Sequence, residues 1–220
     1  MRRDEERPSG SRTSSVTKKL ILSLCDSTGN WPRPYTEDPA YKVVRVDLTK
    51  GNDVRLLRFS NVPVHGILAA PPCTHFCIGG AESWSRKGDE AVLQGLSVVD
   101  ACLRIAAVLR PVWWALENPP GRLKDWIGLC AWTFHPCDFG GYLAPREKSL
   151  RCPLFPARDA YTKRTCIWGT ARKPQPKPVA VAVPPRLENH GFRTPCFFRH
   201  VDHRSVTPLG FARAFKEANP

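Results

Sequence analysis

The chain has 220 residues, a length that suits one α/β domain or one domain with a small appendage. Its 42% hydrophobic content is enough for a core and excludes global disorder, while 33 Lys and Arg against 20 Asp and Glu give a formal net charge of +13, which favours a polyanionic partner. No apolar run approaches the roughly 20 residues that cross a bilayer, and the nine cysteines lack the spacing of a secreted disulfide scaffold, so we expect no membrane association, a cytoplasmic location and reduced thiols.

The first part of the chain predicts alternating strands and turns after a polar leader. Residues 1–18 are basic and rich in serine, and we expect them to be disordered. Short apolar runs that end in polar, Gly or Pro turns predict buried strands. These strands are expected at 19–25, 42–48, 66–70, 112–116 and 166–169. The clearest helix begins at Asp89 and Glu90 and carries apolar residues at spacings of three and four up to Ala106, which predicts a right-handed strand–helix–strand crossover in a largely parallel sheet.

The remainder of the chain predicts loops and one terminal helix. Residues 140–156 contain many Gly and Pro residues and predict a long loop. Residues 171–186 are basic and rich in proline, which favours an extended tether. Thr207 at the N-cap and Pro208 at the first helical position predict a helix over 209–218.

Acidic residues and one cysteine follow the predicted strands. Asp26, Asp47, Asp53, Cys73 and Glu117 stand at or soon after strand ends, and ligands of open parallel sheets bind beyond the carboxyl ends of the strands. Asp47 is placed to hold a ribose diol, although a strand-ending Asp also commonly begins a turn. The ligand and the turn interpretations of these acids both stay open.

Cys73 and Glu117 are candidates for covalent chemistry on a ring. Pro71 and Pro72 fix the chain and present the Cys73 thiol at a rigid turn, where a thiolate can attack an electron-poor carbon. The alternative is a small buried hydrophobe, as most unpaired cysteines are. Glu117, before Asn118, offers a carboxyl that can hydrogen-bond a base edge, or it is simply a loop acid.

Basic and aromatic residues alternate near the C-terminal end, as in Phe192-Arg193 and Phe198-Arg199. Such pairs can bind phosphates and stack bases, or they can belong to a small packed appendage. The cysteines and histidines lack the paired Cys-x-x-Cys spacing of common zinc modules, so we expect no metal site.

Taken in order, these segments resemble the motifs of the DNA (cytosine-5) methyltransferases, and small phage-type members are the most similar. The segments are LSLCDSTGNW at 22–31, PPCTHFCIGG at 71–80, Glu117-Asn118-Pro119, Lys163-Arg164-Thr165 and TPLGFARAFKEAN at 207–219, together with Asp47 and Asp53. The resemblance implies a Rossmann-like, S-adenosylmethionine-dependent methyltransferase fold with a mostly parallel sheet. It divides the chain into a catalytic core at 19–170, a very small target-recognition segment at 171–206 and a C-terminal helix at 207–220 that completes the core.

The resemblance also implies roles for single residues. Cys73 would add to C6 of a cytosine flipped out of DNA, Glu117 would hydrogen-bond the N3 and amino edge, and Arg164 would assist them as a third catalytic residue. A methyl group would pass from S-adenosylmethionine to C5, and Cys73 would then leave. The cofactor would be held by Asp26, Gly29, Trp31, Asp47, Asp53, Pro71 and Thr207. The substrate would be held by Pro72, Asn118, Lys163, Arg193 and Arg199.

The sequence departs from the family pattern in places. Ser27 and Asn30 stand where the family usually has glycines, Thr162 stands where one of two arginines is expected, and Pro119 replaces a valine. Only about 35 residues lie between Trp168 and Val206, where larger members carry their recognition domain. We therefore expect recognition to be short and its contacts to be mostly with phosphates.

Two other functions stay open. One is a non-catalytic nucleic-acid-binding module that keeps the fold, against which the presence of both Cys73 and Glu117 argues. The other is a related enzyme that modifies a nucleotide or an RNA pyrimidine, or that transfers a modified one-carbon group. We expect a monomer in a bacterial or phage-infected cell, where the resemblance implies a role in restriction-modification.

Overall fold

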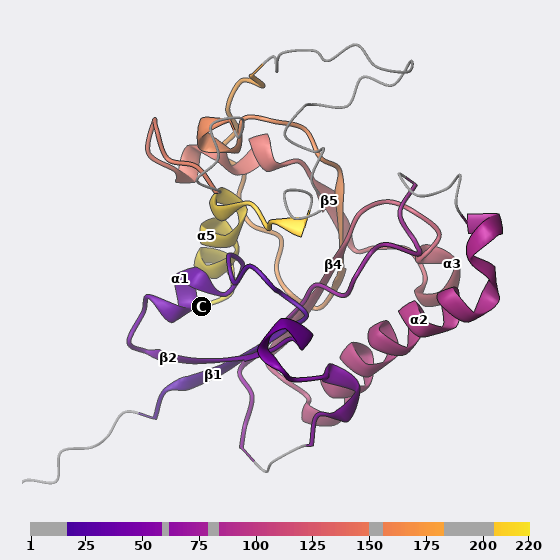
Figure 1. Ribbon diagram of the computed structural model, residues 1–220. Coiled ribbons are helices and arrows are strands. Elements are labelled where there is room, and N and C mark those ends of the chain that lie inside the picture. The colour runs from indigo at the N-terminus through magenta and orange to yellow at the C-terminus, as the bar shows by residue number, and fades with distance from the viewer. Residues whose placement is uncertain (1–16, 59–61, 79–83, 150–155, 183–204) are drawn as a thin grey trace, which may run out of the picture.

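A computed structural model describes residues 17–58, 62–78, 84–149, 156–182 and 205–220. Six strands of this part of the chain form one sheet in the order β2-β1-β3-β4-β6-β5 (Figure 1). The strands are β1 (Lys19–Leu24), β2 (Tyr41–Val46), β3 (Gly66–Ala69), β4 (Trp113–Asn118), β5 (Trp132–Phe134) and β6 (Thr165–Gly169). The helices are α1 (Arg33–Thr36), α2 (Trp84–Leu109), α3 (Lys124–Ile127) and α5 (Leu209–Ala218). The fold is therefore α/β.

The sheet is mixed. Strands β2, β1, β3 and β4 pair in parallel, whereas β6 pairs antiparallel with both β4 and β5. The parallel pairing of β3 with β4, with α2 between them in the chain, confirms the expected strand–helix–strand unit. Because β6 runs against β4, the residues that enter β6 lie beside the carboxyl end of β4. The start of β6 therefore lies at the edge of the sheet where β3 and β4 end.

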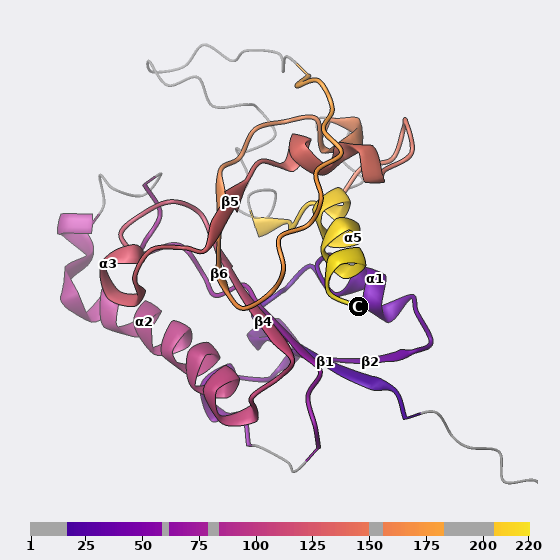
Figure 2. The ribbon, with the colours of Figure 1, turned by 180° about the vertical axis from the view of Figure 1, so that it is seen from behind.

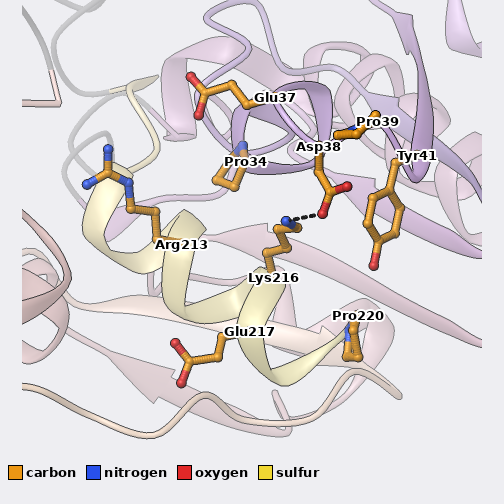
Figure 3. A pocket seen from close by; sticks show the side chains of 9 residues that line it. All are labelled: Pro34, Glu37, Asp38, Pro39, Tyr41, Arg213, Lys216, Glu217 and Pro220. Carbon is orange, nitrogen blue, oxygen red and sulfur yellow. Dashed lines mark hydrogen bonds and ion pairs between the residues drawn. The ribbon is translucent and has the colours of Figure 1, made fainter.

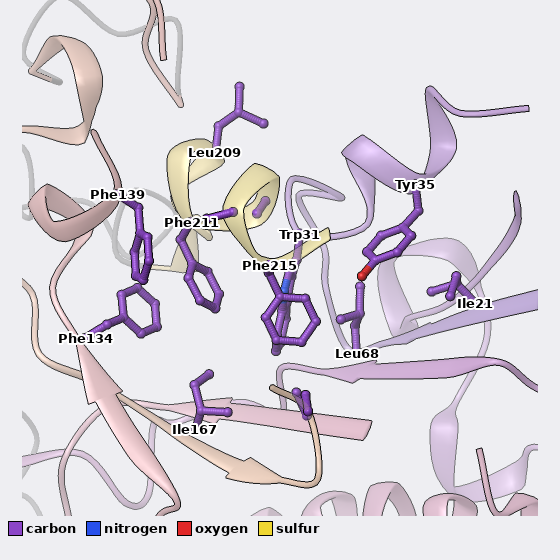
Figure 4. Close-up of a cluster of buried hydrophobic side chains, with 14 of the residues drawn as sticks. Ile21, Trp31, Tyr35, Leu68, Phe134, Phe139, Ile167, Leu209, Phe211 and Phe215 are labelled. Atoms are coloured by element: carbon purple, nitrogen blue, oxygen red, sulfur yellow. The ribbon is translucent and has the colours of Figure 1, made fainter. Parts of the chain in front are cut away.

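Two apolar clusters cover the two faces of the sheet. Alternation along β3 decides the sides, since Ile67 and Ala69 belong to the cluster under α2 whereas Leu68 belongs to the cluster under α1 and α5. Figures 1 and 2 show α2 on one side of the sheet and α1 with α5 on the other. The second cluster is rich in aromatic rings, which Figure 4 shows packed around Phe211 and Phe215 of α5. Both faces are thus covered, as a largely apolar strand sequence requires.

Helix α2 is longer than its periodicity predicts. Gly88, at φ +68°, interrupts it, so that Asp89 and Glu90 open the regular part. By length and composition alone, Gly88–Leu109 is apolar enough to cross a membrane, which corrects the expectation that no segment approaches that length. In this structure one face of it packs on the sheet through Val99, Cys102 and Ile105, as the core helix of an α/β fold does.

The start of α5 corrects one expectation about its cap. The helix spans Leu209–Ala218 as predicted, but Pro208 rather than Thr207 is the N-cap, and it has no side chain that could accept a hydrogen bond. The first helical amides are instead bonded by side chains from another part of the chain, namely Ser149 and Asp159. Local sequence cannot show a cap that comes from a distant segment.

The proline-rich segment is more closely attached than a tether. Within residues 170–182 there is no helix or strand, as expected. However, Lys177 and Val179 donate backbone hydrogen bonds to Asp138 and Cys137, and Gly141 donates one to Lys177, so the segment runs along the 3₁₀ helix Pro136–Tyr142. Proline prevents a regular ladder, but the remaining amides still find acceptors. Residues 1–16 of the predicted leader at 1–18, residues 150–155 of the predicted loop and the predicted tether beyond residue 182 lie outside the described residues.

Candidate active site

The carboxyl ends of β3 and β4 are joined by one buried side chain. Asn118 is fully buried, and its Nδ2 donates a 2.9 Å hydrogen bond to the carbonyl oxygen of Pro71, two residues after the end of β3. Asn118 follows Glu117, and Pro71 stands two residues before Cys73. The bond therefore fixes the segment that carries the thiol against the segment that carries the carboxyl.

The two loops beyond these strands are also bonded to each other. The backbone amide of Ile78 donates to Pro120, and the amide of Arg122 donates to Phe76. A Cβ atom on Gly121 would lie 1.8 Å from the carbonyl oxygen of Phe76, so no larger residue fits at this crossing without a backbone shift. This close approach makes one rigid unit of the cysteine loop and the loop after Glu117.

Cys73 is a half-buried thiol whose surroundings favour its protonated form. A hydrogen bond with Cys77 raises its pKa well above the usual range, and burial and the charge of Glu117 raise it further. The positive charge of Lys163 acts in the opposite direction. At rest the residue is a neutral thiol, so attack on a carbon must be accompanied by loss of the proton.

Glu117 interacts electrostatically with Lys163 and with Asp26. Burial raises the pKa of this carboxyl, Lys163 lowers it and the negative charge of Asp26 raises it. Burial raises the pKa of Tyr161, and the charges of Asp159 and Glu117 raise it further. A carboxyl whose proton affinity is increased by burial is suited to share a proton with a bound base.

Of the two basic residues before β6, Lys163 and not Arg164 changes the pKa of Cys73 and of Glu117. Both precede β6, whose register places Ile167 opposite Glu117 and Cys166 opposite Asn118. Lys163 lowers the pKa of Cys73 and of Glu117, whereas Arg164 is exposed and lowers the pKa of Cys166. The structure thus brings Lys163 to Cys73 and Glu117, and it directs the charge of Arg164 elsewhere.

Asp26 shapes the turn after β1 from within. Its buried carboxylate accepts hydrogen bonds from the amides of Thr28, Gly29 and Trp31 and from the hydroxyl of Thr28. Three of these donors bond Oδ1 and one bonds Oδ2, so the side chain organises the turn from within. Gly29 adopts φ +73°, the left-handed conformation that this turn requires.

Asp47 and Asp53 both begin short 3₁₀ helices. Asp47 accepts the amide and the hydroxyl of Thr49 at Oδ1, and Asp53 accepts the amide and the guanidinium of Arg55, which lowers the pKa of Asp53. Within the part of the chain that the structure describes, Asp47 Oδ2 receives no hydrogen bond. The turn interpretation therefore holds for both acids, while Asp47 retains an acceptor for a ligand.

The other predicted site residues lie in three kinds of place. Trp31 is fully buried, with its ring 5.4 Å from that of Phe215 (Figure 4), and thus belongs to the core. Thr207 is buried before α5, and Pro72 is exposed beside Cys73. Arg193 and Arg199 lie outside the described residues.

No family model matches the sequence, and no curated protein matches it either. Among solved structures, one that is similar to this chain is a candidate DNA modification methyltransferase encoded within an E. coli prophage, with a sequence identity of 14% and a TM-score of 0.43. The alignment covers 69% of this chain and 46% of that protein, so the chain spans less than half of that protein's length. This similarity assigns neither a cofactor nor a target base.

A shallow pocket lies away from these residues (Figure 3). Its lining comes from α1, the start of β2 and the C-terminal half of α5, and Lys216 forms an ion pair with Asp38 across it. Arg213, on the same helix, is bonded to Glu147. The charged groups named here already have partners, so the pocket offers little to a ligand.

Arg45 is a residue of this region that the sequence did not reveal. From β2, its Nη2 donates to the carbonyl oxygens of Asp26 and Ser27, and its guanidinium fills the space where Gly29 has no Cβ atom. Its Nε is buried without a hydrogen-bond partner among the described residues. Arg45 stands two residues before Asp47 on the same strand face, and that spacing was the available signal.

Proposed function

We propose that this protein transfers a methyl group from S-adenosylmethionine to C5 of cytosine in DNA, with Cys73 as the nucleophile. The observation that supports the proposal most directly is the hydrogen bond from Asn118 to Pro71, because it ties the Cys73 loop to Glu117 across two adjacent parallel strands. A thiol and a half-buried carboxyl held at one sheet edge are the two groups that attack at C6 of a pyrimidine needs.

In the proposed reaction the protein supplies a nucleophile and a proton-sharing carboxyl. Cys73 Sγ gives its proton to water and forms a bond to C6, and the electron pair of the C5–C6 double bond becomes available at C5. Glu117, in its protonated form, gives its proton to N3 and accepts a hydrogen bond from the amino group, so the ring does not carry a full negative charge. The charge of Lys163 lowers the pKa of the Cys73 thiol and so favours the thiolate. After the transfer, loss of the C5 proton and release of Cys73 restore the double bond.

The turn after β1 and the end of β2 fit a nucleoside cofactor that also carries an amino-acid group. Asp47 retains Oδ2 as an acceptor for a ribose hydroxyl, and the buried Nε of Arg45 is a donor that a carboxylate would satisfy. Asp53 and Gly29 border the same edge. When bound there, S-adenosylmethionine would supply the electrophilic methyl group.

A nucleic-acid-binding module without catalysis is the second candidate. Two observations favour it: the guanidinium of Arg45 covers the turn after β1, and the environment of Cys73 raises the pKa of the thiol. Such a protein would bind DNA and transfer no label.

Labelled S-adenosylmethionine and DNA separate the two candidates. We expect the wild-type protein to label DNA, and Cys73→Ser to lower the rate by at least about 10³-fold, since the nucleophile is removed. DNA that contains 5-fluorocytosine should form a covalent complex with the wild-type protein and with Cys130→Ser, but not with Cys73→Ser. Equal labelling by the wild type and Cys73→Ser would refute the nucleophile, and DNA binding without labelling by the wild type would support the second candidate.

A further inference from the structure

The turn after β1 is bonded by one side chain to two distant segments. Asn30 Nδ2 donates to the carbonyl oxygen of Ser149 at 2.9 Å and to that of Thr207 at 3.3 Å. The carboxylate of Asp26 is used within the turn itself, so it makes no such link. Asn30 therefore connects the turn to the start of α5 and to the loop before residue 150.

Ser149, together with Asp159, also holds the first amides of α5. The hydroxyl of Ser149 accepts from the amide of Leu209 at 2.6 Å, and Asp159 Oδ2 accepts from the amide of Gly210 at 3.0 Å. Ser149 in turn donates to Asp159 Oδ1, and both side chains are buried. Amides at a helix start need acceptors, and here both acceptors belong to one hydrogen-bonded pair.

The contact is close as well as polar. A Cβ atom on Gly210 would lie 2.5 Å from the carbonyl oxygen of Phe139 and 3.4 Å from Asp159 Oδ2, so α5 begins directly against the 3₁₀ helix Pro136–Tyr142. Asp159 itself has φ +48°, a left-handed conformation that non-glycine residues rarely adopt. These restraints leave the pair of Ser149 and Asp159 little freedom to move apart.

We propose that Asn30, Ser149 and Asp159 form a latch that fixes the turn at 26–31 to the start of α5 and thereby positions this turn for the cofactor. This inference rests on the proposed function, since it takes the turn as part of the cofactor site. The three are positioning residues: none needs to touch the reacting atoms. Asn30 forms this link at a position where the DNA (cytosine-5) methyltransferases, which the sequence resembles, usually have a glycine.

Asn219 provides a matched control, because it is a second asparagine that fastens α5. Its Nδ2 donates to the carbonyl oxygens of Arg172 and Phe215, and its Oδ1 accepts from the amide of Arg172, at the far end of the helix. Asn219→Ala removes comparable bonds without touching the turn. A purely structural role of Asn30 predicts that the two variants behave alike.

The test combines cofactor affinity, turnover and amide exchange in the full-length protein. For Asn30→Ala we expect the dissociation constant of S-adenosylmethionine, measured by calorimetry, to rise about tenfold, while kcat at saturating cofactor changes less than about twofold. Asn219→Ala should lower the melting temperature and leave that dissociation constant within about twofold of the wild type. Equal effects of the two variants on cofactor affinity would overturn the latch.

Hydrogen exchange keeps this result separate from that of the proposed function. In Asp159→Asn, the amides of Thr28, Gly29 and Trp31 should exchange faster, although the substitution lies far from them in the sequence. In Asn219→Ala they should keep their wild-type rates. This readout needs no cofactor, so a wild-type protein that binds no S-adenosylmethionine would refute the proposed function while exchange still decides on the latch. Unchanged exchange of these amides in Asp159→Asn would overturn it.

Discussion

At the scale of single residues, Cys73 differs from the other thiols by its position more than by its immediate partner. A hydrogen bond with Cys25 raises the pKa of Cys102, and burial, with Cys130 beside it, raises the pKa of Cys166 to about 12. Glu117 acts on Cys166 as well as on Cys73. Cys166 is buried within a strand, however, whereas Cys73 is half-buried in a loop that a base could approach.

The thiol pair gives a prediction about reactivity. The hydrogen bond with Cys77 is the largest cause of the raised pKa of Cys73, so Cys77→Ala should lower that pKa and move the pH profile of thiolate formation to lower pH. Iodoacetamide should then alkylate Cys73 roughly threefold faster or more at neutral pH, as followed by peptide mass spectrometry. Cys130→Ala, which changes a different pair, should leave the rate unchanged. A slower reaction in Cys77→Ala would contradict the assigned cause.

At the scale of elements, the edge of the sheet decides which residues meet. The ends of β3 and β4 come together because both strands are parallel neighbours, and Asn118 then fixes their relative position. The antiparallel β6 adds Lys163 from the opposite chain direction. Three segments far apart in the sequence thus contribute to one cluster of charged and nucleophilic groups.

The bond from Asn118 to Pro71 can be tested without changing the size of the side chain. Asn118→Asp removes the Nδ2 donor and places a second acceptor against the carbonyl oxygen of Pro71. We expect the free energy of unfolding, measured with urea, to fall by about 1–3 kcal/mol, and methyl transfer to slow at saturating substrates. Asn52→Ala, which loses only an exposed bond to Lys50, should change stability by less than about 0.5 kcal/mol. Transfer at the wild-type rate in Asn118→Asp would show that the tether is not needed.

Sequence patterns predicted the features that depend on local order. The strand ends that bear Cys73 and Glu117, the β3–α2–β4 unit and the limits of α5 follow from apolar runs and their stop signals. The resemblance assigned Trp31 to the cofactor, whereas the structure packs its ring against α5 in the core, since a tryptophan next to a turn faces a ligand or a core depending on what covers it. Asp159 and Arg45 were missed for the same reason, because their partners lie in other segments.

At the scale of the whole molecule, the positive charge and the small segment after β6 affect which kind of contact the protein would make with DNA under the proposed function. The formal net charge is +13, and about 35 residues separate Trp168 from Val206. Contacts to base edges need side chains that reach into a groove, whereas contacts to phosphates need only charge. If the proposed function holds, a short segment after β6 on a basic protein therefore favours phosphate contacts.

The affinity for duplex DNA should accordingly depend strongly on salt and weakly on sequence. Each phosphate neutralised by the protein lowers the slope of log affinity against log salt by about 0.9, because it releases condensed counterions. For a protein with several such contacts, we expect fluorescence anisotropy to show about 10²-fold or greater weakening between 50 and 200 mM salt. Duplexes of unrelated sequence but equal length should bind within about threefold of one another, since phosphates are common to all of them. Bisulfite sequencing of DNA modified in vitro would extend the comparison from binding to catalysis, and a long, strict consensus around the modified cytosines would contradict recognition by phosphate contacts.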